Sequence, residues 1–411
     1  MEPNTMRRID FWVGVPLCFV VTLAHRLGQW LGGTRPPQDQ PKRVLFIQLA
    51  EMGTMVVAAP ALRKARELFP DATLHFLCFD QARPSLEMLG ILDPNDILTI
   101  DSRSLSSVLR GTLAFMRSAR QRRIDTVINL ESFVRFSSLL SYVAGAPTRV
   151  GFHRFTQEGL YTGDFLTHRV LYNPHVHAAT TFLDLVHALV EPPGQIPSVK
   201  RAYADDSYAV PTITTDAAAE RAIRGKLVGH APEAATARRI VVLNPNASNR
   251  FPMRRLPLDS YAELASRLLE DPDLCIVITG VASEKPDARY IVERVRSPRV
   301  IDMTGETTMT ELLHLFDIAQ VLVTNDSGPA HFACLTRVHV IVCFGPEHPD
   351  RYRPLTPRSD VVHTRLSCSP CVSPFNQRLT SCNDNQCLKR VRVDDVYALV
   401  RRRLDGTPAG A

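Results

Sequence analysis

The sequence predicts an α/β protein made of two doubly wound parallel sheets that face one another across a cleft. Short apolar runs that suit buried strands alternate with stretches of helical periodicity, the pattern of parallel sheets with crossover helices. The alternation stops in a proline-rich stretch and then starts again. The 411 residues suffice for two to three domains of ~150 residues each. No fixed-period repeat is evident, which disfavours solenoids and propellers.

The amino-acid composition and net charge limit the kinds of structure and binding partner that the chain can have. Hydrophobic residues make up 45% of the chain and charged residues 22%, which excludes wholesale disorder and collagen-like or coiled-coil structure. The formal net charge is +6, and no basic block is large enough to suggest a nucleic-acid partner. This balance fits an anionic small substrate or an anionic membrane surface.

Residues 1–40 form an apolar and basic amino-terminal segment. The uncharged stretch from Phe11 to Ala24 is shorter than the ~20 apolar residues that a membrane span needs. Trp12, Trp30 and nearby arginines suit a segment that lies at a membrane surface. There are two alternatives. One is a secretory signal peptide, although no convincing cleavage site follows the apolar stretch, and the other is a helix that packs on the body of the protein.

Residues 41–200 are expected to form the first Rossmann-like domain. In the helix expected at Val56–Phe69, alanine and leucine recur at helical spacing on one face, and Pro70 follows its end. The expected elements are strands at Val44–Leu49, Leu74–Phe79 and Asp125–Leu130 and a helix at Val56–Phe69.

A linker at residues 201–215 precedes the second domain, residues 216–390, and a carboxyl-terminal helix and tail occupy residues 391–411. Thr308 and Glu311 have the spacing of a capping box, which predicts a helix after them. The other expected elements are strands at Ile240–Asn244, Leu274–Thr279, Val300–Met303, Val321–Thr324 and Val338–Phe344 and helices at Ser260–Leu269 and Pro329–Leu335.

The most informative stretch is Val321-Leu-Val-Thr-Asn-Asp-Ser-Gly-Pro-Ala-His331. An apolar strand ends in polar and small residues, and a helix is expected to begin at the following proline. Free N–H groups and the dipole of a helix N-terminus favour a phosphate there. Gly328 allows close approach, while Asp326, Ser327 and His331 could contact phosphate or sugar. The alternative is an ordinary capped helix with a satisfied, partly buried His331.

The first domain has a comparable turn, Leu49-Ala-Glu-Met-Gly-Thr54. Glu51, Gly53 and Thr54 follow a strand, at the edge where open α/β sheets bind ligands. A carboxylate there can take the proton that an attacking hydroxyl must lose. The alternative is a solvated loop carboxylate.

A third stretch, Asn244-Pro-Asn-Ala-Ser-Asn-Arg250, precedes a pair of arginines. Asn246 and Ser248 are small polar groups at a strand end. Arg254 and Arg255 suit the charge that grows on a departing diphosphate. The alternative is a basic surface pair. Further on, Glu284 could bond a ribose hydroxyl or cap the next helix.

Four of the nine cysteines cluster near the carboxyl terminus with the spacing C-x2-C-x10-C-x4-C. Such a set can hold a structural zinc ion, form two disulfides or remain as free thiols, and we assign no catalytic role to it. The other five lie in apolar runs, where free cysteine behaves as a small hydrophobe. The whole set does not have the pattern of a small secreted disulfide scaffold, so a reducing compartment is expected. The clustered residues are Cys368, Cys371, Cys382 and Cys387.

Taken together, these stretches resemble glycosyltransferase family 9, the ADP-heptose:lipopolysaccharide heptosyltransferases and their relatives. The resemblance runs from about Val44 to Val400. It is carried by Phe46-Ile-Gln-Leu-Ala-Glu-Met-Gly-Thr54, Ala59-Pro-Ala-Leu62, Arg149-Val-Gly-Phe152, Asn325-Asp-Ser-Gly-Pro-Ala-His331, Phe344-Gly-Pro346 and Cys368-Ser-Pro-Cys371.

The resemblance implies a GT-B fold, with an acceptor site in the first domain and a nucleotide-sugar site in the second. It also implies inverting, metal-independent transfer of a sugar, heptose from ADP-heptose, to a lipopolysaccharide-core or related lipid-linked saccharide. By position, Asp326, Ser327, Gly328 and His331 would contact the donor's phosphates and sugar. Arg254 or Arg255 would bind phosphate, and Glu284 would meet the ribose. No cofactor is required.

The chain departs from the family pattern in the first turn. Family members commonly have Gly-Asp there, with the aspartate as the base, whereas this chain has Gly53-Thr54. Threonine is no base near neutral pH, so Glu51 is the expected substitute. Another nucleotide sugar or acceptor, or a silent module that binds nucleotide sugar or glycolipid, are the alternative functions. The expected location is cytoplasmic and peripheral, at the inner face of the cytoplasmic membrane.

Overall fold

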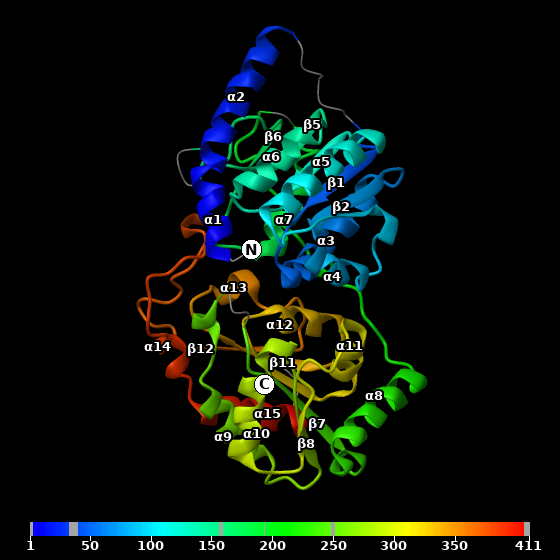
Figure 1. The fold of residues 1–411 in the computed structure, drawn as a ribbon, viewed down its shortest axis with the longest axis vertical. Helices are drawn as coiled ribbons and strands as arrows, with labels where there is room; N and C mark the ends of the chain where they lie inside the picture. The colour runs from blue at the N-terminus through cyan, green and yellow to red at the C-terminus, as the bar shows by residue number, and fades with distance from the viewer. Residues whose placement is uncertain (1–2, 33–39, 156–158, 193, 248–250, 407–411) are drawn as a thin grey trace. The chain divides into compact units, whose positions relative to one another are not determined.

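A computed structural model describes residues 3–32, 40–155, 159–192, 194–247 and 251–406. The chain divides into two compact units (Figure 1). Unit 1 is Met1–Ala209 together with Ser373–Arg378, and unit 2 is Val210–Val372 together with Leu379–Ala411. A short segment from late in the sequence therefore belongs to the amino-terminal unit.

Unit 1 is built on a six-stranded sheet of order β3-β2-β1-β4-β5-β6, in which every pair of neighbours is parallel. This is the doubly wound order, which reverses between β1 and β4. Its strands are β1 Arg43–Ile47, β2 Thr73–Phe79, β3 Ile97–Ile100, β4 Thr126–Asn129, β5 Thr148–His153 and β6 His168–Leu171. Its helices are α1 Pro3–Trp12, α2 Gly14–Trp30, α3 Met52–Leu68, α4 Arg83–Glu87, α5 Leu105–Gln121, α6 Arg135–Val143 and α7 Ala178–His187.

Unit 2 repeats the same topology, with strand order β12-β11-β10-β7-β8-β9 and parallel neighbours throughout. The order reverses between β7 and β10. Its strands are β7 Arg239–Asn244, β8 Leu274–Ile278, β9 Val300–Asp302, β10 Val321–Asn325, β11 His339–Phe344 and β12 Ser359–His363. Its helices are α8 Ala217–His230, α9 Leu258–Leu268, α10 Lys285–Val295, α11 Met309–Ile318, α12 Gly328–Phe332, α13 Pro349–Tyr352, α14 Gln386–Lys389 and α15 Val393–Leu404.

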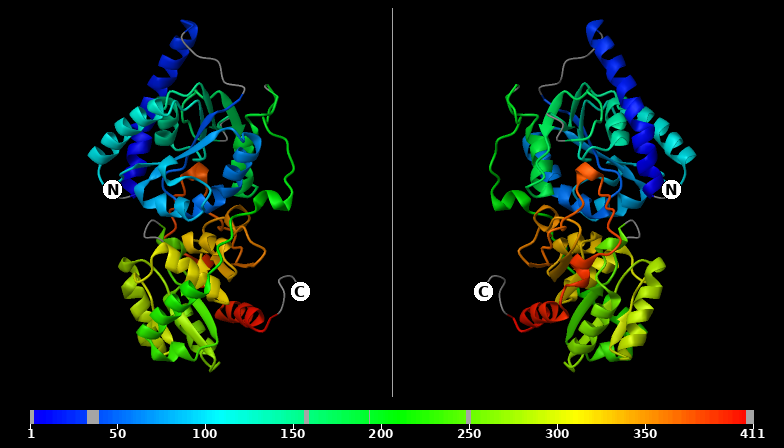
Figure 2. Two further views of the ribbon diagram at one scale, coloured as in Figure 1. Left: turned by 90° about the vertical axis from the view of Figure 1, so that its right-hand side faces the viewer. Right: turned by 90° about the vertical axis from the view of Figure 1, so that its left-hand side faces the viewer.

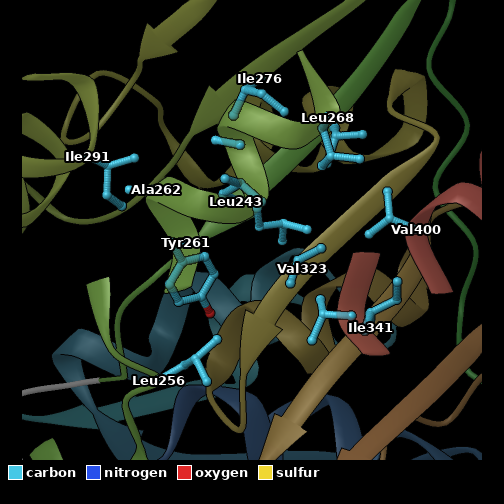
Figure 3. Packing of buried hydrophobic residues seen from close by; sticks show 14 of the residues in the cluster. Leu243, Leu256, Tyr261, Ala262, Leu268, Ile276, Ile291, Val323, Ile341 and Val400 are labelled. Atoms are coloured by element: carbon cyan, nitrogen blue, oxygen red, sulfur yellow. The ribbon is translucent and has the colours of Figure 1, made fainter. Parts of the chain in front are cut away.

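Each unit has its own apolar core. In unit 1, Leu45 and Ile47 of β1 pack with Phe115 of α5 and Leu140 of α6. In unit 2, alternate residues of the central strands pack against α9, α10 and α15, with Tyr261 fully buried among them (Figure 3). Alternation buries one set of side chains on each face of a sheet, and helices on both faces cover them.

The predicted strands are all present, with bounds that differ by one or two residues. The predicted Thr308–Glu311 capping box is confirmed: Thr308 Oγ1 accepts the N–H of Glu311 at 3.2 Å, and Glu311 Oε2 accepts the N–H of Thr308 at 2.8 Å. The helix expected from Val56 begins earlier, at Met52. It is buried on all sides from Gly53 to Leu62 rather than along one face, because α7 packs against it.

The amino-terminal segment forms two consecutive helices that pack on unit 1 (Figures 1 and 2). Thr5–Trp30 is apolar and long enough to cross a membrane by length and composition, so the expectation that the stretch is too short was wrong. Gly14, Cys18, Thr22 and His25 form the buried seam of α2, at helical spacing. A side chain at position 14 would clash with Arg135 of α6, so glycine permits this close packing.

Candidate active site

In unit 2 the polar residues gather at the carboxyl ends of β7 and β10, where the strand order reverses. Ligands of open α/β sheets bind at this point, because the crossover helices leave to opposite faces there. Asn244 ends β7 and Asn325 ends β10. Of the predicted donor residues, Asn246 follows β7, and Asp326, Ser327, Gly328 and His331 follow β10.

Arg254 is the central cation of this group. Its Nη1 lies 3.3 Å from Asp326 Oδ2, and its Nη2 lies 3.0 Å from Glu347 Oε2. The arginine side chain is 13% exposed, and those of Asp326 and Glu347 are 5% and 1% exposed. The guanidinium also lies over the ring of Phe251, 4.6 Å from its centroid. The structure therefore brings together two predicted residues, Arg254 and Asp326, and adds a third, Glu347.

Asn325 positions the segments that carry these groups. Its Nδ2 donates to the carbonyl of Pro245 at 2.8 Å, and its Oδ1 accepts the N–H of Leu256 at 2.9 Å. The fully buried amide thus ties the end of β10 to the chain on both sides of the arginine turn. Asn325 begins the Asn325-Asp-Ser-Gly-Pro-Ala-His331 stretch, and nothing in its local sequence predicts this role.

The buried polar atoms that have no hydrogen-bond partner within the described part of the chain include Arg254 Nε, a donor, and Asn246 Oδ1, an acceptor. Native proteins leave few buried polar atoms unsatisfied, so each indicates a ligand or an ordered water. A donor suits a phosphate oxygen, and an acceptor suits a sugar or ribose hydroxyl.

The turn after β10 differs from its prediction. The expected helix Pro329–Leu335 is an α-helix only over Gly328–Phe332, and a 3-10 turn, Ala333–Leu335, follows it. So short a helix has little dipole, and a nearby cation is the stronger source of positive charge. Ser327 Oγ donates to the Asn325 carbonyl at 3.2 Å, and His331 is buried one turn further on.

The structure gives the remaining predicted donor residues that it describes, Arg255 and Glu284, partners other than Arg254. Arg255 turns away from Arg254 and pairs with Asp287 of α10 at 3.5 Å. Glu284 Oε2 accepts the N–H of Val281 at 2.9 Å, which is the capping alternative, and burial raises the pKa of this carboxyl. Ser248 lies outside the described residues.

In unit 1, the first-turn residues lie at the carboxyl end of β1. Glu51 is the residue before α3, and its carboxylate is ion-paired with Arg378. Gly53 and Thr54, expected in a loop, lie inside the first turn of α3. Thr54 Oγ1 donates to the Glu51 carbonyl at 2.6 Å and its N–H does so at 3.0 Å, which closes that turn. The threonine hydroxyl thus serves the helix start.

A second carboxylate, Glu131, lies just beyond β4, and sequence reasoning missed it. Its Oε1 accepts the N–H of Leu49 at 2.7 Å, which joins the ends of β1 and β4. Burial, helped by the charge of Glu51, raises the pKa of Glu131 to about 7 against the Leu49 hydrogen bond. The one feature of the sequence that could have indicated Glu131 is its position two residues after β4, the strand next to β1 in the sheet.

The late segment Ser373–Arg378, orange in Figure 2, belongs to unit 1 and supplies the arginine. Phe375 packs on Phe133 and Tyr172, with ring centroids 5.8 Å and 5.5 Å apart. This aromatic contact holds the segment against unit 1. Nothing in the sequence links position 378 to position 51.

The clustered cysteines are all free thiols, so neither disulfide of that alternative is formed. No three His, Cys, Asp or Glu side chains within the described ranges are grouped so that they could hold a metal ion. Cys371 Sγ lies 3.4 Å from Thr380 Oγ1, and Cys387 is buried.

A family model described as glycosyltransferase family 9 (heptosyltransferase) matches residues 112–379. Lipopolysaccharide heptosyltransferase 2 of Escherichia coli (strain K12) is 22% identical over 333 residues, which cover 78% of this chain and 87% of that protein.

Solved structures share the fold. The E. coli ADP-heptose lps heptosyltransferase II has a TM-score of 0.67 at 18% identity and covers 88% of this chain and 98% of its own. The glycosyl transferase family 9 protein from Veillonella parvula has a TM-score of 0.68 at 17% identity and covers 90% and 98%. The two sheets therefore have the expected GT-B architecture.

Proposed function

The chain belongs to glycosyltransferase family 9, and from that premise we propose that it transfers heptose from ADP-heptose to a lipopolysaccharide-core or related lipid-linked saccharide. The relative in E. coli is named a lipopolysaccharide heptosyltransferase, and a structural neighbour is named for ADP-heptose. The observation that carries the proposal is Arg254, a nearly buried guanidinium with an unsatisfied Nε–H at the switch point of unit 2.

The donor would bind through its diphosphate to Arg254. A guanidinium has five N–H donors in a planar fork, so Arg254 can keep Asp326 and Glu347 and still donate to phosphate. As the sugar leaves, negative charge grows on the diphosphate, and a fixed cation in a dry site stabilises that charge. Because the arginine supplies this charge, the transfer proceeds without a metal ion.

The reaction is a single displacement. The acceptor oxygen forms a bond to the anomeric carbon while the bond from that carbon to the diphosphate oxygen breaks, and ADP leaves with the electron pair. Attack opposite the leaving group inverts the anomeric centre. The acceptor hydroxyl gives its proton to a carboxylate of unit 1, where Glu51 and Glu131 lie.

The protein would bind the inner face of the cytoplasmic membrane through α1 and α2. The seam of α2 packs on unit 1, and Asp10 of α1 accepts the N–H of Phe136 at 2.9 Å. The outer face stays apolar, with Trp12 74% and Trp30 82% exposed. A helix that packs by one face and exposes apolar residues on the other suits the plane of a membrane interface rather than a span. The free thiols fit a reducing compartment.

Donor binding and transfer test the proposal in two steps. ADP and ADP-heptose should raise the melting temperature of the purified protein, because a ligand of the folded state stabilises it. UDP-glucose is the matched control for the base and sugar. With lipopolysaccharide from a heptose-deficient strain as acceptor, ADP release should then follow. Nucleotide binding without turnover would indicate a silent module, and a preference for UDP-glucose would indicate another donor.

A further inference from the structure

Glu131 lies just beyond the carboxyl end of β4, at the point where the sheet of unit 1 reverses its order. In the register of β1 and β4, Ile47 lies opposite Asn129, so Glu51 and Glu131 follow neighbouring strand ends. The hydrogen bond from Leu49 N–H to Glu131 Oε1, 2.7 Å long, fixes the carboxylate to the end of β1. No donor among the described residues reaches Oε2.

The two carboxylates of this site differ in their partners. Glu51 is ion-paired with Arg378, so it has to give up that partner before it can take a proton. Glu131 has a neutral backbone donor instead and stays partly accessible to solvent. Protonation of Glu131 therefore does not require it to give up a cation.

The charges around Glu131 come from three elements. Glu51 at the start of α3 and Asp10 of α1 raise its pKa, as burial does to a larger extent. Arg378 of the late segment and the Leu49 N–H lower it. The balance leaves the pKa at about 7, where a general base is most effective near neutral pH.

We propose that Glu131, held by the Leu49 N–H, is the general base of the transfer and accepts the acceptor's hydroxyl proton on Oε2, with the charges of Glu51 and Arg378 acting on it. The inference rests on the proposed function. The proton passes from the acceptor oxygen to Glu131 as that oxygen bonds to the anomeric carbon, and ADP leaves with the electrons of the broken bond. Thr54, in the position where an aspartate is common in relatives, then has no acid–base role.

Glu131→Gln separates catalysis from structure. The glutamine keeps an oxygen that can accept the Leu49 N–H but cannot take a proton near neutral pH. We expect transfer from ADP-heptose to heptose-deficient lipopolysaccharide to fall by about 10²- to 10⁴-fold. The melting temperature and its rise with ADP should be unchanged. Glu67→Gln, an exposed partner of Lys64 on α3, is the matched control and should transfer normally.

Each outcome decides the inference. Full transfer by a folded Glu131→Gln variant would overturn it and leave the proposed function intact. If that variant does not fold, Glu131→Asp keeps a carboxylate: slow transfer that still rises with pH near neutrality supports the base role, and a flat profile overturns it. Wild-type protein that binds ADP but never transfers overturns the proposed function and the inference with it.

Discussion

The switch points of the two units hold the same groups in different arrangements. Each has one arginine and two carboxylates: Arg254 with Asp326 and Glu347 in unit 2, and Arg378 with Glu51 and Glu131 in unit 1.

In unit 2 the arginine contacts both carboxylates and still has an unsatisfied Nε–H. In unit 1 the arginine pairs with Glu51, and Glu131 is left with a raised pKa. The two arrangements therefore differ in the group that remains available to a ligand. In unit 2 it is the Arg254 Nε–H, a hydrogen-bond donor that suits an anion, and in unit 1 it is the Glu131 carboxylate, which can accept a proton. Under the proposed function, the same fold supplies an anion-binding group in unit 2 and a proton acceptor in unit 1, because the three charged groups pair differently in the two units.

The largest expected effect comes from Arg254→Ala. Two nearly buried carboxylates would lose their cation, and breaking a buried pair costs about 3–5 kcal/mol. Transfer should fall by roughly 10²- to 10³-fold, the usual effect of removing one group that stabilises the leaving charge. Calorimetry and ADP release measure the two effects.

Arg255→Ala is the matched variant in the same turn. Its pair with Asp287 is 25% and 31% exposed, so its loss should cost about 0–1 kcal/mol. Arg254→Lys keeps the charge without the planar fork and should restore stability more than transfer. Equal losses of transfer in the two alanine variants would show that the second arginine also binds phosphate.

The next effect concerns α2 alone. Phe19, Leu23 and Leu27 are each more than half exposed on the outer face of this helix. Changing all three to serine should lower binding to anionic phospholipid vesicles by tenfold or more, because each buried apolar side chain contributes about 1.5–3 kcal/mol. Sedimentation with the vesicles measures it.

The folded body should be unaffected by this triple change, since the seam of α2 is untouched. Leu105, Leu109 and Leu113 form a comparable exposed stripe on α5, and the same change there is the matched control. Vesicle binding that survives the α2 change and is lost with the α5 change would move the membrane face from α2 to α5.

A smaller effect separates the roles within unit 1. Transfer should rise with pH through about 7, because Glu131 has to be ionised to accept a proton. The charge of Glu51 raises this pKa and that of Arg378 lowers it. Glu51→Gln should therefore move the midpoint of the pH–rate profile to lower pH, and Arg378→Gln to higher pH. Shifts of both midpoints in one direction would contradict this assignment.

These two sites also differ in how far the sequence predicts them. The predicted donor residues between Asp326 and His331 belong to one contiguous stretch after an apolar strand, so a local pattern was enough to predict a phosphate-binding turn there. Glu131 and Arg378 carry no local motif: one follows an unremarkable strand, and the other comes from a segment 327 residues after Glu51. Only the strand order and the docking of Phe375 bring them together, and a single sequence does not contain that information.

Local signals succeeded where the physics is local. The Thr308 capping box involves four residues and was predicted as found. The start of α3 was missed, because Thr54 closes a turn by bonding to the carbonyl of Glu51, and apolar periodicity does not report such a bond. Burial of α3 on all sides likewise depends on α7, which lies far along the chain.

The smallest effect tests whether the two units are energetically separate. Thr308 caps α11 in unit 2 and Ser104 caps α5 in unit 1, where its Oγ accepts the N–H of Ser107 at 3.1 Å. Replacing either by alanine should cost about 1 kcal/mol, or roughly 2–4 °C for a domain of this size.

Because each unit has its own core, loss of a cap should lower the melting temperature of only the unit that contains it, as measured by calorimetry. The unit 2 transition is identified by its rise with ADP, which binds there under the proposed function. Thr308→Ser and Ser104→Thr keep the hydroxyl and serve as controls. If both alanine variants lower the melting temperature of one common transition by the same amount, the units unfold together. A substitution in unit 2 would then also lower the stability of unit 1, which contains Glu131.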